Sequence, residues 1–174
     1  MKKPELLSSL TRNYDSFLDY INYLSDESYA FKVDEKWSAG QHLDHLVLST
    51  KAIVSVFQLD KISIAEKFGM PTNSKHSYTS LKTFYFEKLD NGGKAPERFV
   101  PDKKVVHQKI LAGQNLKIYI EQLSTAIESF SEEELDTLCI PHPLLGDLTL
   151  REMLYNAIYH AEHHQKLIAK MLNT

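Results

Sequence analysis

The sequence predicts an all-α protein, a four-helix bundle with one long crossover connection. Glycine and proline are scarce, six of each in 174 residues, and they gather in clusters such as 69–71, 92–101 and 141–146. Between these clusters, apolar residues recur at spacings of three and four, which is the period of a helix. Almost no stretch alternates β-branched with polar residues, so no strands are expected.

Two long helices are expected in the first third of the chain. The second of them begins after Ser38, because Gln41 three residues later completes a capping box, and it continues to about Asp60. It is apolar on nearly two faces, which is typical of a helix that touches two neighbours. The first helix spans about Pro4 to Leu24, with its apolar residues at helical spacing: Leu6, Leu10, Tyr14, Phe17, Leu18 and Ile21.

The second half of the chain predicts two more long helices. One runs from about Asp102 to Phe130 and is followed by a turn or two that opens at Ser131. The last begins at Thr149, which forms a second capping box with Glu152, and continues to about Leu172. The apolar stripe of the helix over 102–130 is expected at Val106, Ile110, Leu111, Ile118, Leu123 and Ile127.

A long connection, from Lys61 to Pro101, separates the second and third long helices and carries a shorter helix over about Ser77 to Leu89. Four helices of about 20 residues span about 30 Å each and can bury their apolar stripes by packing side by side. The connection is longer than a hairpin needs, and such segments often border a site. We therefore expect it to rim a cleft. Its aromatic stretches, FYF at 84–86 and RFVP at 98–101, are expected as core packing rather than as a roof.

Composition indicates a single soluble domain over residues 1–174. Hydrophobic residues make up 43% and charged residues 25% of the chain, which is ordinary for a globular protein. The net charge is −3 without a basic block, so nucleic acid is not expected as a partner. No stretch approaches the ~20 apolar residues of a membrane span, and no signal peptide is evident, so no membrane partner is expected. The single cysteine, Cys139, excludes an intramolecular disulfide and fits a cytoplasmic location.

Three of the eight histidines lie within five residues, in the stretch YHAEHHQKLI. His160 and His164 face the core side of the last predicted helix, one turn apart, where both rings can hold one ion. His163 points away and is expected as a solvated surface histidine. On this spacing alone, two core histidines satisfied by hydrogen bonds are an equal alternative. A third ligand would come from His42 or His45 on the second helix, and periodicity does not choose between them.

Two motifs resemble the DinB-like superfamily. KWSAGQHLDHL is similar to the start of that family's second helix. HPLLGDLTLREMLYNAIYHAEHHQKLI looks like its last helix and the preceding turn, in the form of the DinB_2 branch. The resemblance covers most of the chain and implies a four-helix bundle with an open three-histidine metal site. Matched residue by residue, it implies His45, His160 and His164 as ligands. His42 falls where the family usually has an apolar residue. It is expected to be partly exposed, with a polar group near the site as the alternative.

The resemblance also implies a cofactor and a reaction. The cofactor is a divalent transition metal, zinc or nickel first, with iron or manganese as alternatives. Known relatives include bacillithiol S-transferases and a mycothiol-dependent maleylpyruvate isomerase. A thiol S-transferase that joins a low-molecular-weight thiol to a small-molecule substrate is therefore the favoured function.

Two alternatives to the transferase remain open. A metal-bound hydroxide would give a hydrolase. A non-catalytic bundle could instead bind a ligand or a structural metal, and a structural site normally takes a fourth protein ligand. The spare histidines do not favour this, because His142 is expected in a turn, His107 is expected to be exposed, and the resemblance gives His76 no ligand role. Whether the protein is a monomer or a homodimer also stays open.

Overall fold

The computed structural model describes residues 1–69, 71, 75–102 and 108–173. These residues form helices and one short hairpin, so the predicted all-α class is confirmed. None of the described helices is long and apolar enough to cross a membrane. The long helices are α1 (Lys3–Tyr23), α3 (Ala39–Phe57), α6 (Lys109–Glu128) and α8 (Leu150–Leu172). The shorter elements are α2 (Asp26–Ala30), α4 (Lys61–Phe68), α5 (Tyr78–Asp90), the 3-10 helix η1 (Glu97–Phe99), α7 (Glu132–Thr137), β1 (Cys139–His142) and β2 (Gly146–Thr149).

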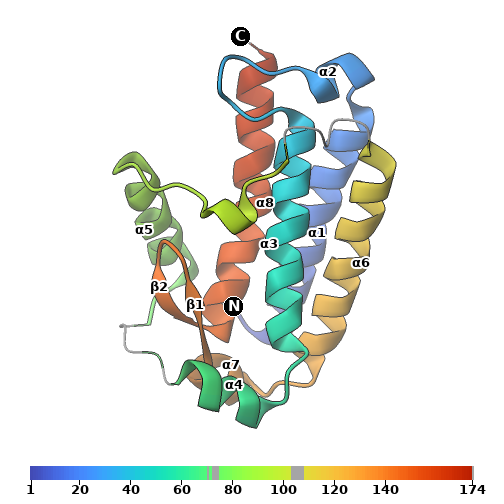
Figure 1. The fold of residues 1–174 in the computed structure, drawn as a ribbon. Coiled ribbons are helices and arrows are strands. Elements are labelled where there is room, and N and C mark those ends of the chain that lie inside the picture. The colour runs from blue at the N-terminus through green and yellow to red at the C-terminus, as the bar shows by residue number, and fades with distance from the viewer. Residues whose placement is uncertain (70, 72–74, 103–107, 174) are drawn as a thin grey trace.

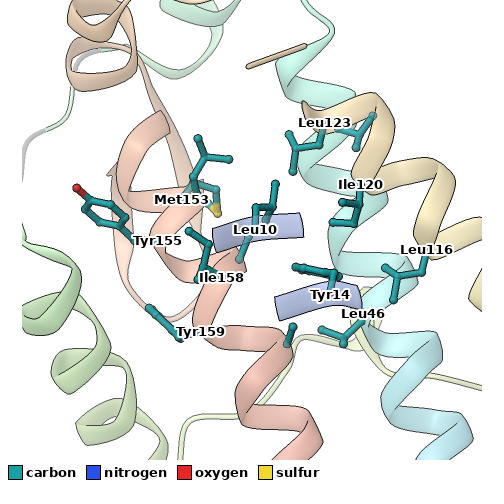
Figure 2. Packing of buried hydrophobic residues seen from close by; sticks show 14 of the residues in the cluster. Leu10, Tyr14, Leu46, Leu116, Ile120, Leu123, Met153, Tyr155, Ile158 and Tyr159 are labelled. Carbon is teal, nitrogen blue, oxygen red and sulfur yellow. The ribbon is translucent and has the colours of Figure 1, made fainter. Parts of the chain in front are cut away.

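The four long helices pack side by side around a hydrophobic core (Figure 1). Helix α1 contacts α6 and α8, and α3 contacts the same two helices, so the four close a ring. Figure 2 shows part of the core, where Leu10 and Tyr14 of α1 lie between Ile158 of α8 and Ile120 of α6. Burial of apolar side chains of this kind is the dominant favourable term in folding.

The helix starts follow the capping chemistry of the sequence. Ser38 and Gln41 form the expected capping box at α3, and Thr149 and Glu152 form the second one at α8. The short helices α2 and α4 were not expected, and they start in the same way, with a polar side chain that accepts from a backbone N–H. The two capping boxes fix where α3 and α8 begin, and thereby which of their residues face each other.

The first half of helix α6 presents a different face to the core from the one expected. It begins at Lys109, and the predicted helical residues 103–107 lie outside the described part of the chain. Three residues of the expected stripe are exposed, Ile110 at 76%, Leu111 at 52% and Ile118 at 47%, so the prediction is wrong for these three, whereas Leu123 and Ile127 are buried as expected. The helix packs against α1 and α3 through a row of apolar residues that includes these two: Ala112, Leu116, Ile120, Leu123 and Ile127.

A β-hairpin between α7 and α8 was not expected from the sequence. Its strands β1 and β2 pair antiparallel, with Cys139 opposite Thr149 and His142 opposite Gly146. Gly146 has a positive φ of 77°, a conformation that glycine adopts because it has no Cβ. Strands of four residues show too little alternation for periodicity to reveal them. The hairpin leads directly into α8 and packs against α8 and α4.

The connection over 61–101 covers the side of the molecule formed by α3 and α8. Its described residues form α4, α5 and η1. Helix α5 packs against α8, and η1 packs against α3 (Figure 1). The connection therefore lies where it can enclose side chains that α3 and α8 share.

Candidate metal centre

Three histidine rings from two helices meet at one point. His45 comes from α3, and His160 and His164 come from successive turns of α8. The Nε2 atom of His160 lies 3.2 Å from Nε2 of His45 and 2.9 Å from Nε2 of His164. One ring nitrogen from each residue falls within 4.8 Å of the other two. The three residues that the resemblance implied are thus brought together, and their role as metal ligands stays a prediction.

Helix geometry and one backbone contact hold the rings in this arrangement. Residues four apart lie one turn apart on the same helix face, so His160 and His164 point the same way. His45 is fixed through its other ring nitrogen, because its Nδ1 lies 2.7 Å from the carbonyl oxygen of Phe99 at the end of η1. A carbonyl oxygen only accepts, so Nδ1 carries the proton of the neutral ring. The Nε2 of His45 then has its lone pair directed at the cluster.

Burial keeps these imidazoles neutral. His45 and His164 are 6% and 4% exposed, and His160 is the least covered of the three. Burial, and then the neighbouring histidines, hold the pKa of His160 and of His164 well below the ordinary value. Burial also lowers the pKa of His45, against the opposing effect of its bond to Phe99. In the described part of the chain, no carboxylate is hydrogen-bonded to any of the three rings.

The donor set fits a divalent transition ion. Zinc bonds imidazole nitrogen at about 2.0–2.1 Å, so tetrahedral ligands lie about 3.4 Å apart. The separations of 3.2 Å and 2.9 Å are close to that value. Among the described residues the cluster offers three ligands, the number typical of catalytic zinc sites, whereas structural sites are closed by four.

His42 and Trp37 pack against the rings of the cluster. His42 is 6% exposed, and its Nδ1 lies 2.7 Å from Nδ1 of His164. The expectation of a partly exposed His42 is therefore wrong. The ring of Trp37 covers this side of α3, with its centre 5.6 Å from that of His42 and 5.0 Å from that of His45. Burial, followed by the charges of nearby histidines, lowers the pKa of His42 to about 3.

A cavity of about 470 Å³ opens beside the cluster. All three clustered histidines line it, together with apolar side chains from α3 and from the hairpin. The described residues of the 61–101 connection also contribute to the wall, so its predicted role as a rim is confirmed. They include Phe68, Tyr85, Leu89, Pro96, Arg98 and Phe99.

One expectation about the cavity wall is wrong, and another is incomplete. His163 is not a solvated surface residue, because its ring lies 5.3 Å from that of Phe86 and 5.9 Å from that of Tyr85, centre to centre. Helix α5 covers this side of α8, and burial lowers the pKa of His163 to about 4. Tyr85 is 5% exposed and belongs to the hydrophobic core, as expected, and together with Phe99 it also lines the cavity. Local periodicity could not reveal this, because a segment distant in sequence builds the wall.

His142 and Asn156 form a polar contact in the cavity wall. His142 is the last residue of β1, so it lies beside the expected turn and not in it, and its Nδ1 accepts the backbone N–H groups of Leu144 and Leu145. Its side chain is also hydrogen-bonded to Asn156, which donates to the Tyr159 hydroxyl at 2.8 Å. Burial lowers the pKa of His142 to about 4. Asn156 was not singled out in the sequence, and only its burial beside the cavity draws attention to it.

Neither His76 nor Cys139 joins the cluster. His76 stacks on the ring of Phe84, and His107 lies outside the described residues. The thiol of Cys139 is fully buried and donates to the carbonyl oxygen of Phe68. Burial raises the pKa of this thiol, which agrees with an inert cysteine.

Comparison with known families gives one match. The DinB_2 model of the DinB superfamily matches residues 9–168, a range that includes α3, most of α8 and all three clustered histidines. Comparison with curated proteins gives no match. The family match supports the fold, and the activity has to be argued from the site.

Proposed function

The chain belongs to the DinB superfamily, and on that premise we propose that it is a metal-dependent enzyme with His45, His160 and His164 as metal ligands. The proposed metal is zinc or nickel, with iron or manganese as alternatives, because imidazole ligands alone do not select among these ions. The proposed reaction is the transfer of a low-molecular-weight thiol to an electrophilic small molecule. The family resemblance supports the transferase reaction, and the geometry supports an open metal site.

One observation carries the proposal. The converging ring nitrogens lie in the wall of a cavity and not in a closed core. The cavity volume of about 470 Å³ falls within the range of small-molecule sites, about 300–1,000 Å³. A small molecule in this cavity would lie beside all three rings.

The proposed transfer needs a thiolate, an electrophile and a cavity that keeps water away from the reacting atoms. A divalent ion held by three neutral imidazoles keeps its full charge and lowers the pKa of a thiol or water at its open position. The protein orients His45 through the Phe99 carbonyl, and the apolar wall excludes water from the reacting atoms. In the transfer, the thiol loses its proton to solvent and its sulfur bonds the electrophilic carbon. The leaving group departs with the electron pair of the bond that breaks.

The lining of the cavity indicates what kind of electrophile fits. The wall is mostly apolar, and Arg98 is the one lysine, arginine, aspartate or glutamate among its described residues. Arg98 is exposed at the rim, and its guanidinium lies 4.9 Å from the centre of the Phe99 ring. A positive group at a cavity mouth attracts anions. We therefore propose an apolar electrophile that carries a negative group, for which Arg98→Met should raise KM more than for a neutral analogue.

The test starts with metal analysis of protein purified without a nickel column. The metal-loaded protein is then incubated with an aryl halide and each of several low-molecular-weight thiols, and the thioether product is measured. His160→Ala and chelator-treated wild type are the two controls. Product formation above the uncatalysed rate, lost in both controls, supports the proposal. Absence of metal binding by the wild-type protein would contradict it.

Two other outcomes would redirect the assignment. Hydrolysis of an ester or amide by the metal-loaded protein, without thiol transfer, would identify a hydrolase. Bound metal with neither activity would identify a non-catalytic metal-binding protein.

A further inference from the structure

We infer that His42 is a positioning residue, which accepts a hydrogen bond on its Nδ1 from the Nδ1–H of His164. This bond holds His164 in the tautomer whose Nε2 lone pair faces the metal site. The inference rests on the proposed metal site and adds a residue to it. It starts from the 2.7 Å separation of the two Nδ1 atoms, which is the distance of a hydrogen bond.

Two imidazole nitrogens at this distance share one proton. Two lone pairs would repel each other, and so would two N–H groups, so one ring donates and the other accepts. The Nε2 of His164 is directed at the cluster, 2.9 Å from Nε2 of His160. A nitrogen that binds a metal carries no proton, so the proton of neutral His164 lies on Nδ1. His164 is therefore the donor and His42 the acceptor.

The surroundings keep this pair in place. His42 and His164 are 6% and 4% exposed, which limits competition from water for the bond. The ring of Trp37 packs against both, with its centre 5.6 Å from that of His42 and 6.3 Å from that of His164. His42 thus does for His164 what the Phe99 carbonyl does for His45. Outer partners of this kind typically change metal affinity by about 10–100-fold.

The experiment compares the Zn²⁺ affinity of four proteins by competition with a chromogenic chelator. His42→Leu fills the space without an acceptor, and its affinity should fall by about 10–100-fold relative to wild type. His42→Asn places an amide oxygen near the position of Nδ1 and should recover most of that loss. The matched control is His76→Leu, which removes a histidine that does not line the cavity. The ring of His76 stacks on Phe84 and has no hydrogen bond to the three rings in the described structure, so this control should keep the wild-type affinity.

Affinities are compared only between folded proteins. Helical circular dichroism of the metal-free variants first establishes that they are folded, and His42→Met replaces the leucine variant if that one does not fold. Equal affinities of wild type and the folded apolar variant would overturn the role of His42 and leave the metal site intact. A loss that asparagine does not restore would also overturn it, because packing would then be the cause. Failure of wild type to bind Zn²⁺ would overturn this inference together with the proposed function.

Discussion

Two polar clusters share helix α8, and they balance charge in different ways. Arg151, near the start of the helix, is 8% exposed and is bonded to Asp136 at 2.5 Å and to Glu132 at 2.6 Å. Further along, His160 and His164 meet His45 with no hydrogen-bonded carboxylate in the described part of the chain. The arginine cluster contains its own counter-charges, whereas the histidine cluster consists of neutral rings.

This difference in charge distinguishes a cluster whose charges are paired within the protein from a cluster that can bind a cation. Removing one partner from a buried ion pair is costly, and Arg151 gains further bonds from the carbonyl oxygens of Met1 and Glu132. The histidine rings carry no charge, because burial lowers their pKa. Their Nε2 atoms point at one another, and lone pairs directed at one point are stabilised by a cation there rather than by each other.

Removal of His164 should have the largest effect on the histidine cluster. With His164→Ala one of three ligands is lost, so Zn²⁺ binding should fall below detection by titration calorimetry. The helices should stay folded, because the apolar core supplies most of the stability. His76→Ala is the matched control, because His76 does not line the cavity, and it should bind Zn²⁺ as wild type does. Retained binding by His164→Ala would show that the three histidines are not the metal site.

The histidines and the arginine cluster should contribute to the free energy of unfolding over different pH ranges. Burial is the main cause that lowers the pKa of His42 to about 3 and that of His163 to about 4. The unfolded chain binds protons near the ordinary histidine pKa of about 6.5 and the folded chain does not. The free energy of unfolding of the metal-free protein should therefore fall as pH drops from about 6.5 toward 4, by about 1.4 kcal/mol per pH unit for each such histidine.

Glu132 of the arginine cluster also loses its contribution as pH falls, but over a lower pH range. The backbone N–H of Lys3, and then Arg151, lower its pKa. Its contribution is fully present above the unfolded value of about 4.3 and is lost only as pH falls below that. Urea unfolding of chelator-treated protein between about pH 7 and pH 2 measures both effects. A stability that stays flat down to pH 5 would contradict the assignment of the histidines as buried neutral groups.

Disruption of the arginine cluster should change stability and leave metal binding alone. Arg151→Met should lower the free energy of unfolding by about 2 kcal/mol, because the bonds to Glu132 and Asp136 are lost. The two carboxylate side chains are 38% and 39% exposed, so water compensates part of the loss. Urea unfolding gives the first quantity and Zn²⁺ titration the second. A reduced Zn²⁺ affinity in the folded variant would mean that the two clusters are coupled.

Local chemistry predicted those parts of the site that depend on one helix. The capping box at Thr149 and the spacing of His160 and His164 are both properties of a few consecutive residues. The choice of His45 over His42 was different, because α3 is apolar on nearly two faces and both histidines are 6% exposed. Periodicity could not separate them, and the family resemblance singled out His45.

Features that depend on distant segments were not predictable from local patterns. His163 faces away from the core on the wheel of its own helix, and α5 covers it only in the folded chain. Tyr85 lines the cavity for the same reason. The contact between His42 and His164 spans two helices, so no spacing within either helix could indicate it.

Thermal unfolding followed by helical circular dichroism, with Zn²⁺ and with a chelator, tests most directly whether the histidine cluster is a ligand site on a fold that stands without it. We predict that the chelated protein stays helical and unfolds cooperatively. Its midpoint should lie about 5–10 °C below that of the protein with Zn²⁺ at about 100 times Kd, because an ion that binds only the folded state stabilises it by mass action. Loss of helical signal on chelation at room temperature would instead make the ion structural. Identical midpoints under the two conditions would mean that the cluster binds no ion, and either result would contradict the account.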